Sequence, residues 1–298
     1  MTLKEAIYLV RPYSLPASIS PVLVAIATFL LEGSFLTTRS MWAGVLCFFV
    51  ALIGQCFCNV VNDIADFKSG ADQVERKGFE RIVASGIVSL KVAHRAAILL
   101  AIFTALTGAL VVFLSGNLWL LLLGLFVLLG AYAYSAGPFP LAYNSLGEVA
   151  VFIFYGLVAT MGTYYVATGM ITRNIFLLGA AMGLASVNIL LINNYRDAES
   201  DRKVGKKTIA VRFGEDLLPQ LYTTNILLIL LCISPYYNWL TLLLIIPFFI
   251  FEMRLSKDMK REKGNALNRV LAKTAKGVLI LAISLILILL AHHLIFFK

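Results

Sequence analysis

Apolar blocks alternate with short polar segments along the 298 residues of this chain. Most blocks hold about 20 residues, the length that an α-helix needs to cross roughly 30 Å of hydrocarbon. The pattern predicts an all-α, polytopic membrane protein with about nine transmembrane helices, preceded by an amphipathic lead-in. The predicted spans are residues 16–31, 41–61, 92–114, 118–134, 146–168, 175–192, 217–235, 239–253 and 277–296.

Composition excludes several other classes of protein. With 60% hydrophobic and 14% charged residues, the chain is too apolar for a water-soluble domain. All four cysteines fall inside apolar blocks, which indicates small buried side chains rather than a disulfide or zinc framework. The net charge of +9 favours anionic lipid or an anionic substrate. No basic patch is interleaved with exposed aromatic residues, so we expect no nucleic-acid partner.

The positive residues predict an orientation in the membrane. If the N-terminus is cytoplasmic, the outside segments hold only Arg39, Arg173 and Lys298, and all other Lys and Arg residues fall inside. Cytoplasmic loops of membrane proteins carry such an excess of positive charge. We therefore predict a multi-pass protein of the cell inner membrane, with its N-terminus and its long polar loops in the cytoplasm.

The second apolar block ends in polar residues at helical spacing. Asn59, Asn62, Asp63 and Asp66 recur at i, i+3, i+4 and i+7, so that their side chains share one helix face. Ionisable groups at a membrane boundary are costly unless they have a role. Residues 63–90 are predicted to form a long polar loop after this block.

The sixth apolar block ends in a second arrangement of the same kind, made by Asn193, Asn194, Asp197 and Asp201. Both arrangements fall on the predicted cytoplasmic side, as a paired site requires. Their repetition suggests two related helix groups, although no sequence period is good enough to prove a duplication.

Carboxylates and asparagine oxygens followed by cations are typical of a site that holds Mg²⁺ and, through it, a pyrophosphate group. The candidate catalytic carboxylates are Asp63, Asp66, Asp197 and Asp201. The candidate anion-binding cations are Lys68, Arg81, Arg202, Lys206 and Lys207. An alternative for the cations is that they are ordinary positive residues of cytoplasmic loops, which need no substrate.

The motifs Asn62-Asp63-x-x-Asp66 and Asp197-x-x-x-Asp201 resemble the two aspartate-rich motifs of the UbiA superfamily of intramembrane prenyltransferases. The stretches that carry the resemblance are residues 11–24, 62–72, 137–143 and 193–208, and they are most similar to the branch that prenylates 1,4-dihydroxy-2-naphthoate in menaquinone synthesis. The resemblance implies a single domain, residues 1–298, that forms a nine-helix bundle around a central cavity open to lipid.

Site residues also follow from the resemblance. The family usually places an acid four residues beyond Asp66, where this chain has Gly70, and the nearest acid is Asp72. The implied metal ligands are Asn62, Asp63, Asp66, Asp72, Asp197 and Asp201. The implied substrate contacts are Asn59, Asn62, Lys68, Arg81, Tyr134, Asn193, Asn194, Arg196, Arg202, Lys206 and Lys207. Many relatives carry a Lys shortly after the residue matching Tyr134, and its absence here weakens a hydroxybenzoate assignment.

The resemblance further implies a chemical reaction. Mg²⁺ neutralises the departing pyrophosphate of an all-trans polyprenyl diphosphate, and the ring of 1,4-dihydroxy-2-naphthoate attacks the allylic carbon. Loss of CO₂ then gives demethylmenaquinol. The isoprenoid tail lies among apolar helices next to membrane lipid, where little water reaches the cation.

Three other functions stay open at this point. The first is a sister prenyltransferase that acts on another aromatic acceptor, such as 4-hydroxybenzoate or homogentisate. The second is a cation-coupled transporter, but transporters usually place their acids near the bilayer midplane on broken helices. The third is a quinone-binding scaffold without catalysis, which leaves two complete acidic motifs unexplained.

Overall fold

The computed structural model describes residues 2–32, 37–68 and 81–296, and every regular element in these ranges is a helix. The long helices are α2 (Leu15–Glu32), α3 (Thr38–Lys68), α4 (Leu90–Ser115), α5 (Leu120–Ser135), α8 (Arg173–Lys203), α10 (Leu217–Cys232), α11 (Trp239–Arg261) and α12 (Leu267–Phe296). The shorter ones are α1 (Leu3–Val10), η1 (Pro12–Ser14), η2 (Leu141–Tyr143), α6 (Gly147–Val151), η3 (Phe152–Gly162), α7 (Thr163–Thr168), α9 (Ile209–Phe213), η4 (Ser234–Tyr236) and η5 (Gly264–Ala266).

Seven helical segments of the described chain are long and apolar enough to cross a bilayer. Two shorter apolar helices, α5 and α10, have 16 residues each and lie where the fourth and seventh spans were predicted. The predicted all-helical, polytopic class is therefore confirmed. The count of nine spans stays a prediction, because α5 and α10 fall short of the usual spanning length.

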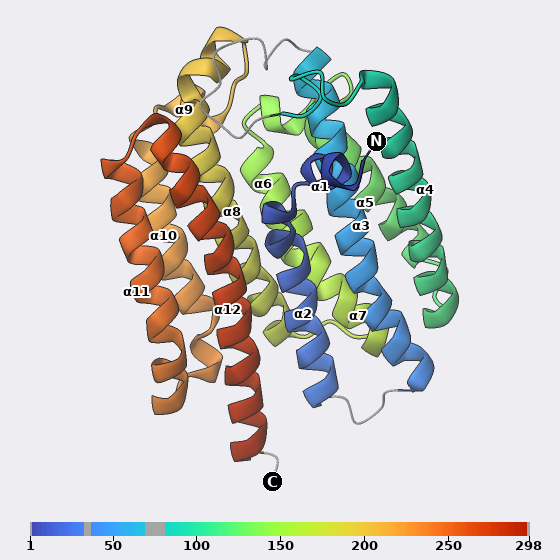
Figure 1. Cartoon of the computed structure of the whole chain (residues 1–298). Helices are drawn as coiled ribbons and strands as arrows, with labels where there is room; N and C mark the ends of the chain where they lie inside the picture. The colour runs from blue at the N-terminus through green and yellow to red at the C-terminus, as the bar shows by residue number, and fades with distance from the viewer. Residues whose placement is uncertain (1, 33–36, 69–80, 297–298) are drawn as a thin grey trace.

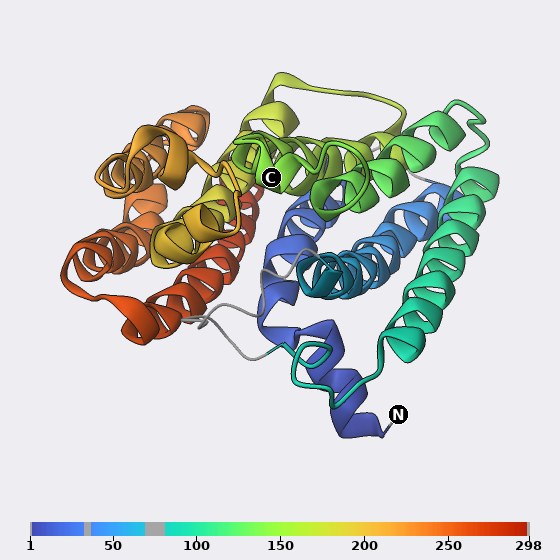
Figure 2. The same cartoon turned by 90° about the horizontal axis from the view of Figure 1, so that it is seen from above.

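The helices form a bundle in which α2 and α8 lie between two outer groups (Figures 1 and 2). One group contains α3, α4 and α5, and the other contains α10, α11 and α12. The helix pair η3 and α8 packs closely because glycines meet at the contact: a Cβ at Gly156 would lie 2.5 Å from the Cα of Gly183. Small residues allow helices in a membrane to approach in this way.

Two helices extend further than the hydropathy pattern predicted. Helix α3 continues to Lys68, so the loop predicted for residues 63–90 is wrong for its first six residues, and α8 continues to Lys203. The apolar blocks mark only the segments that are uniformly apolar, whereas the helices run on because their polar ends bury their side chains against the bundle. Both acidic motifs therefore lie on helices, and Asp72 lies outside the described residues.

Candidate active site

A polar cavity of about 230 Å³ lies between the ends of α3 and α8 that are drawn uppermost in Figure 1. The motif residues that line it are Asn59, Asn62 and Asp66 from α3 and Asn193, Asn194, Asp197 and Asp201 from α8. Two motifs more than 120 residues apart in the chain thus face one space. Asp63 is the exception, because it is buried behind the cavity wall and does not line it.

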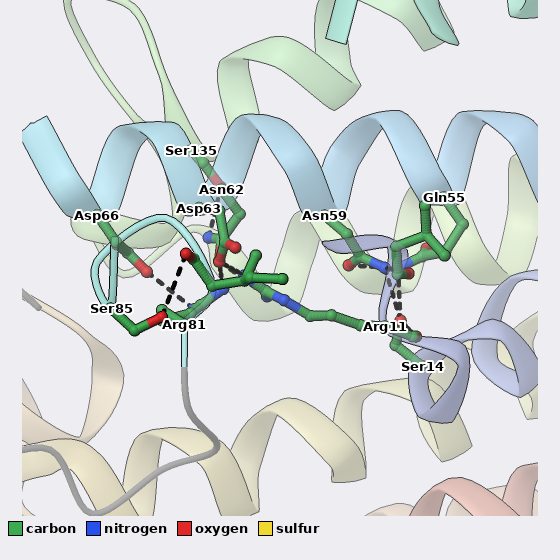
Figure 3. A network of polar contacts seen from close by, with 12 residues as sticks. Arg11, Ser14, Gln55, Asn59, Asn62, Asp63, Asp66, Arg81, Ser85 and Ser135 are labelled. Atoms are coloured by element: carbon green, nitrogen blue, oxygen red, sulfur yellow. Dashed lines mark hydrogen bonds and ion pairs between the residues drawn. The ribbon is translucent and has the colours of Figure 1, made fainter. Parts of the chain in front are cut away.

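Two arginines from distant segments hold the acids of α3, as Figure 3 shows. Arg81 donates from Nη1 to Oδ1 of Asp63 at 2.7 Å and from Nη2 to Oδ2 of Asp66 at 2.9 Å. Arg11 donates to Asp63 as well, and to Oδ1 of Asn62 at 3.2 Å. Forked, charge-assisted hydrogen bonds of this kind are among the strongest that proteins make. The first motif is therefore fixed by groups that the hydropathy pattern did not connect to it.

The N-terminal segment is anchored on the same face of α3. The amide of Asn59 donates to the carbonyl oxygen of Val10 at 2.7 Å and to Oγ of Ser14 at 2.9 Å. Between these residues, Arg11 has a backbone φ of +51°, in the left-handed region that non-glycine residues rarely adopt. That turn directs the guanidinium of Arg11 toward α3 (Figure 3). Arg11 precedes Pro12 in a stretch that resembles the family, which was the available signal, but no site role was predicted for it.

On α8, Arg196 is bound to protein groups on several sides. Its guanidinium donates to both oxygens of Asp197, at 2.8 and 2.6 Å, and to Oδ1 of Asn193 at 2.8 Å. A fourth bond, at 2.7 Å, reaches Oδ1 of Asn268 at the start of α12. The amide of Asn194 donates to the buried Glu148 at 2.7 Å. These contacts orient the second motif.

Lys206 connects the two motifs. Its ammonium lies 2.9 Å from Oδ1 of Asp66 and 3.9 Å from Oδ1 of Asp201, and 4.4 Å from the centre of the Tyr143 ring. The turn at Gly205, with φ of +74°, and a bond from the Lys206 amide to the Asp201 carbonyl set its position. Burial lowers the pKa of Lys206, but the carboxylate of Asp66, the phenol oxygen of Tyr143 and the carboxylate of Asp201 together outweigh burial and raise the pKa well above the usual range. The ammonium therefore stays protonated at neutral pH.

Three cations predicted to contact substrate lie elsewhere. Lys68 is exposed at the end of α3, 3.1 Å from the ring of His94. The side chain of Arg202 is 57% exposed and lies 3.9 Å from Glu215, and Lys207 is exposed. None of the three lines the polar cavity, so the structure brings together Arg81, Arg196 and Lys206 but not these.

A second cavity, of about 390 Å³ and almost entirely apolar in its lining, adjoins the polar one and lies between α3, α4, α5 and η3. Four residues line both cavities: Gln55, Cys58, Tyr134 and Tyr155. The hydroxyl of Tyr155 donates to Oε1 of Gln55 at 2.5 Å. Tyr134 was a predicted contact, whereas Gln55 and Tyr155 were missed; the available signal was a polar and an aromatic side chain inside predicted spans.

The donor groups fit Mg²⁺ in one particular way. Carboxylate and amide oxygens are the ligands that Mg²⁺ prefers, and it is usually held by one or two carboxylates together with substrate phosphates. Within the described residues, no three Asp, Glu, His or Cys side chains form a ready metal-binding group. Asp66 on one wall, and Asp197 and Asp201 on the other, are therefore suited to share a metal ion with a phosphate ligand rather than to enclose one alone.

Comparison with known proteins adds to this geometry. The model of the UbiA prenyltransferase family matches residues 18–276. The chain belongs to the UbiA prenyltransferase family. The match confirms the predicted resemblance, and together with the apolar helices it makes the chain a multi-pass membrane protein.

Individual members of the UbiA family are similar over most of the chain. The 1,4-dihydroxy-2-naphthoate octaprenyltransferase of Escherichia coli is 28% identical over 91% of this chain and 90% of its own length. The protein of the same name from Mycobacterium tuberculosis is 32% identical over 71% of this chain and 70% of its own. A UbiA homologue from Archaeoglobus fulgidus, solved with GPP and Mg²⁺, has a TM-score of 0.62 at 17% identity and covers 95% of this chain and 99% of its own. At 17% identity, the similarity to this solved structure supports the shared fold alone.

Proposed function

We propose that this protein transfers a polyprenyl chain from a polyprenyl diphosphate to 1,4-dihydroxy-2-naphthoate, with loss of pyrophosphate and CO₂, to give demethylmenaquinol. The observation that carries the proposal is a polar cavity between two acidic helix ends that shares a wall with an apolar cavity. A diphosphate with an isoprenoid tail has the same division into a charged and an apolar part. Relatives named as 1,4-dihydroxy-2-naphthoate octaprenyltransferases support this acceptor.

The charged end of the substrate belongs between the two motifs. In this proposal Arg81 and Lys206 turn from Asp66 to the diphosphate oxygens, because a diphosphate offers them more negative charge than one carboxylate does. Asp66, Asp197, Asp201 and the neighbouring asparagine oxygens would hold Mg²⁺. When bound, Mg²⁺ supplies neutralisation of the charge that builds up on the departing pyrophosphate.

The reacting carbon then falls where the two cavities meet. The allylic C–O bond breaks there and its electron pair leaves with pyrophosphate, beside the rings of Tyr134 and Tyr155. Aromatic faces stabilise a nearby positive charge, and an apolar surround keeps water away from it. A ring carbon of the acceptor forms the new C–C bond, and loss of its carboxyl group as CO₂ restores aromaticity. Gln55, held by Tyr155, offers polar contacts to the acceptor at this point.

The orientation is part of the same proposal. The N-terminus and the two motif ends would face the cytoplasm of a cell inner membrane, where the soluble aromatic acid is available. The positive residues that follow both motifs support this arrangement. Helix α1 and the last turns of α12 lie toward opposite ends of the bundle (Figure 1), so the end of α12 would face outward.

Replacing Gly108 by Phe is expected to shift the enzyme toward short prenyl chains. Gly108 lines the apolar cavity, and no atom lies within 4 Å of a Cβ built there. The lining of α4 runs from Thr104 to Val112, a rise of about 12 Å, room for roughly two or three isoprene units of about 5 Å each. A phenyl ring in that space excludes the later units.

The measurement for Gly108→Phe is kcat/KM with geranyl diphosphate against a long polyprenyl diphosphate. We expect the ratio to change by about tenfold or more in favour of the short chain. Gly108→Ala is the matched control and should keep the wild-type ratio. An unchanged ratio in Gly108→Phe would show that the tail does not use this cavity.

The function itself is tested with the purified full-length chain in liposomes, supplied with a polyprenyl diphosphate, 1,4-dihydroxy-2-naphthoate and Mg²⁺. We expect a prenylated, decarboxylated lipid product and one pyrophosphate per product, both lost when Mg²⁺ is removed with a chelator. Reaction with 4-hydroxybenzoate instead would replace the acceptor and keep the reaction class. No product with any acceptor, from folded protein, would favour a transporter or a quinone-binding protein.

A further inference from the structure

The carboxylate of Asp66 already has positively charged neighbours within the protein. Its Oδ2 accepts from Arg81 at 2.9 Å, and its Oδ1 faces Lys206 at 2.9 Å and the Tyr143 hydroxyl at 2.7 Å. The side chain of Asp66 is 3% exposed and that of Lys206 is 13% exposed, so water screens these charges only weakly. Within the described part of the chain, Arg81 and Lys206 therefore both lie at an acid that lines the cavity and is a candidate metal ligand.

Lys206 also reaches the opposite wall of the cavity. Its ammonium is 3.9 Å from Asp201, so the same positive charge lies near one acid of each motif. The short loop that carries it is fixed at both sides: the Lys206 amide binds the Asp201 carbonyl, and the Lys207 amide binds the Tyr143 carbonyl at 2.9 Å. The backbone hydrogen bonds of the loop after α8 thus fix the position of Lys206.

A free divalent cation meets an unfavourable site under these conditions. It would have to approach Asp66 against the like charges of Arg81 and Lys206 or displace both. A diphosphate changes this balance, because its oxygens attract Arg81 and Lys206 and at the same time offer ligands to the metal. Metal and diphosphate then bind with positive coupling, which acts equally in both directions.

We propose that Lys206 stands in for the metal ion between the two motifs, so that the divalent cation enters the site together with the diphosphate rather than before it. This inference rests on the proposed diphosphate site and adds an order of assembly to it. Toward the metal, Lys206 acts through Asp66 and Asp201 as a positioning residue, in addition to its proposed contact with the diphosphate. If Lys206 only held the diphosphate, its removal would weaken diphosphate binding and leave the binding of the metal alone unchanged.

The test titrates purified full-length protein in detergent with Mn²⁺, an oxygen-binding substitute for Mg²⁺. Free Mn²⁺ is followed by electron paramagnetic resonance, with no diphosphate present. Wild-type protein is expected to bind Mn²⁺ weakly, and Lys206→Met to bind it on the order of tenfold more tightly. Lys206→Arg, which keeps the positive charge, should stay close to the wild type.

Lys203→Met is the matched control, because it removes the same charge from a surface ion pair with Glu199 at 2.9 Å. Its Mn²⁺ affinity should equal that of the wild type. Adding Asp66→Asn to Lys206→Met should abolish the gain, which locates the extra ion at Asp66. Unchanged Mn²⁺ affinity in Lys206→Met, or an equal gain in Lys203→Met, would overturn the inference.

The inference and the proposed function can fail separately. Prenyl transfer plays no part in the Mn²⁺ titration, so a wrong acceptor leaves the titration result standing. Conversely, the wild type could form product while Lys206→Met shows no gain in Mn²⁺ affinity. That result would keep the proposed function and refute the order of assembly. Gel filtration of each variant confirms that the compared proteins are folded.

Discussion

Replacing Asp66 by Asn is expected to lower prenyl transfer by roughly 10³-fold in protein that remains folded. Asp66 accepts hydrogen bonds from Arg81, Tyr143 and Lys206. Through Lys206, which also lies 3.9 Å from Asp201, it is linked to the second motif. Asparagine preserves the size of the side chain and one acceptor oxygen but removes the negative charge. Without that charge, the site loses attraction for the metal that neutralises the departing pyrophosphate.

The rate of lipid product formation measures this effect, with the melting temperature in detergent as the check on folding. Glu199→Gln is the matched control: Glu199 lies on α8 between Asp197 and Asp201, but its side chain is 56% exposed. The control should retain wild-type activity. Comparable losses in both variants would mean that general surface charge, rather than the position of Asp66, determines the rate.

The paired acidic faces could be predicted because helical spacing is a local property. Asn59, Asn62 and Asp66 share a face wherever α3 lies, and the same is true of Asp197 and Asp201 on α8. Their common side of the membrane followed from the positive residues. Periodicity and charge together thus brought the two motifs to one end of the bundle, where the structure places them around one cavity.

The cations were harder to predict, because their partners depend on the path of the chain between helices. Arg11 reaches Asp63 across 52 residues and Lys206 reaches Asp66 across 140, and neither separation leaves a periodic signal. Lys68 and Arg202 stand next to the motifs in sequence, yet their helix positions turn them toward the surface. Nearness in sequence was therefore a poor guide to which cations face the cavity.

Arg196 illustrates a further limit of sequence reasoning. It was predicted as a substrate contact because it lies inside the second motif, and it does line the cavity. Its four hydrogen bonds nevertheless go to Asn193, Asp197 and Asn268. The bond to Asn268, which lies 72 residues further along the chain, links α8 to α12. A motif shows that a residue belongs to a site, but the fold decides whether it faces ligand or protein.

Replacing Arg196 by Met is accordingly expected to destabilise the protein by about 3–5 kcal/mol, because it leaves the largely buried carboxylate of Asp197 without its partner. Such a loss is a large part of the stability of a typical domain. Arg196→Lys should recover only part of it, since an ammonium cannot bind both carboxylate oxygens and two asparagines as the guanidinium fork does. The melting temperature in detergent measures both effects.

Kinetics separate a bracing role for Arg196 from a substrate contact. If Arg196 holds Asp197 in place, Arg196→Met should lower kcat along with stability, because a displaced carboxylate no longer holds the metal during the reaction. If Arg196 bound the acceptor or the diphosphate, the KM for that substrate should rise while the melting temperature stayed unchanged. Arg202→Met is the matched control on the same helix, and its exposed side chain predicts a change within about 0.5 kcal/mol. If Arg196→Met were as stable as that control, Arg196 would not hold Asp197 in place, and its predicted role as a substrate contact would be favoured.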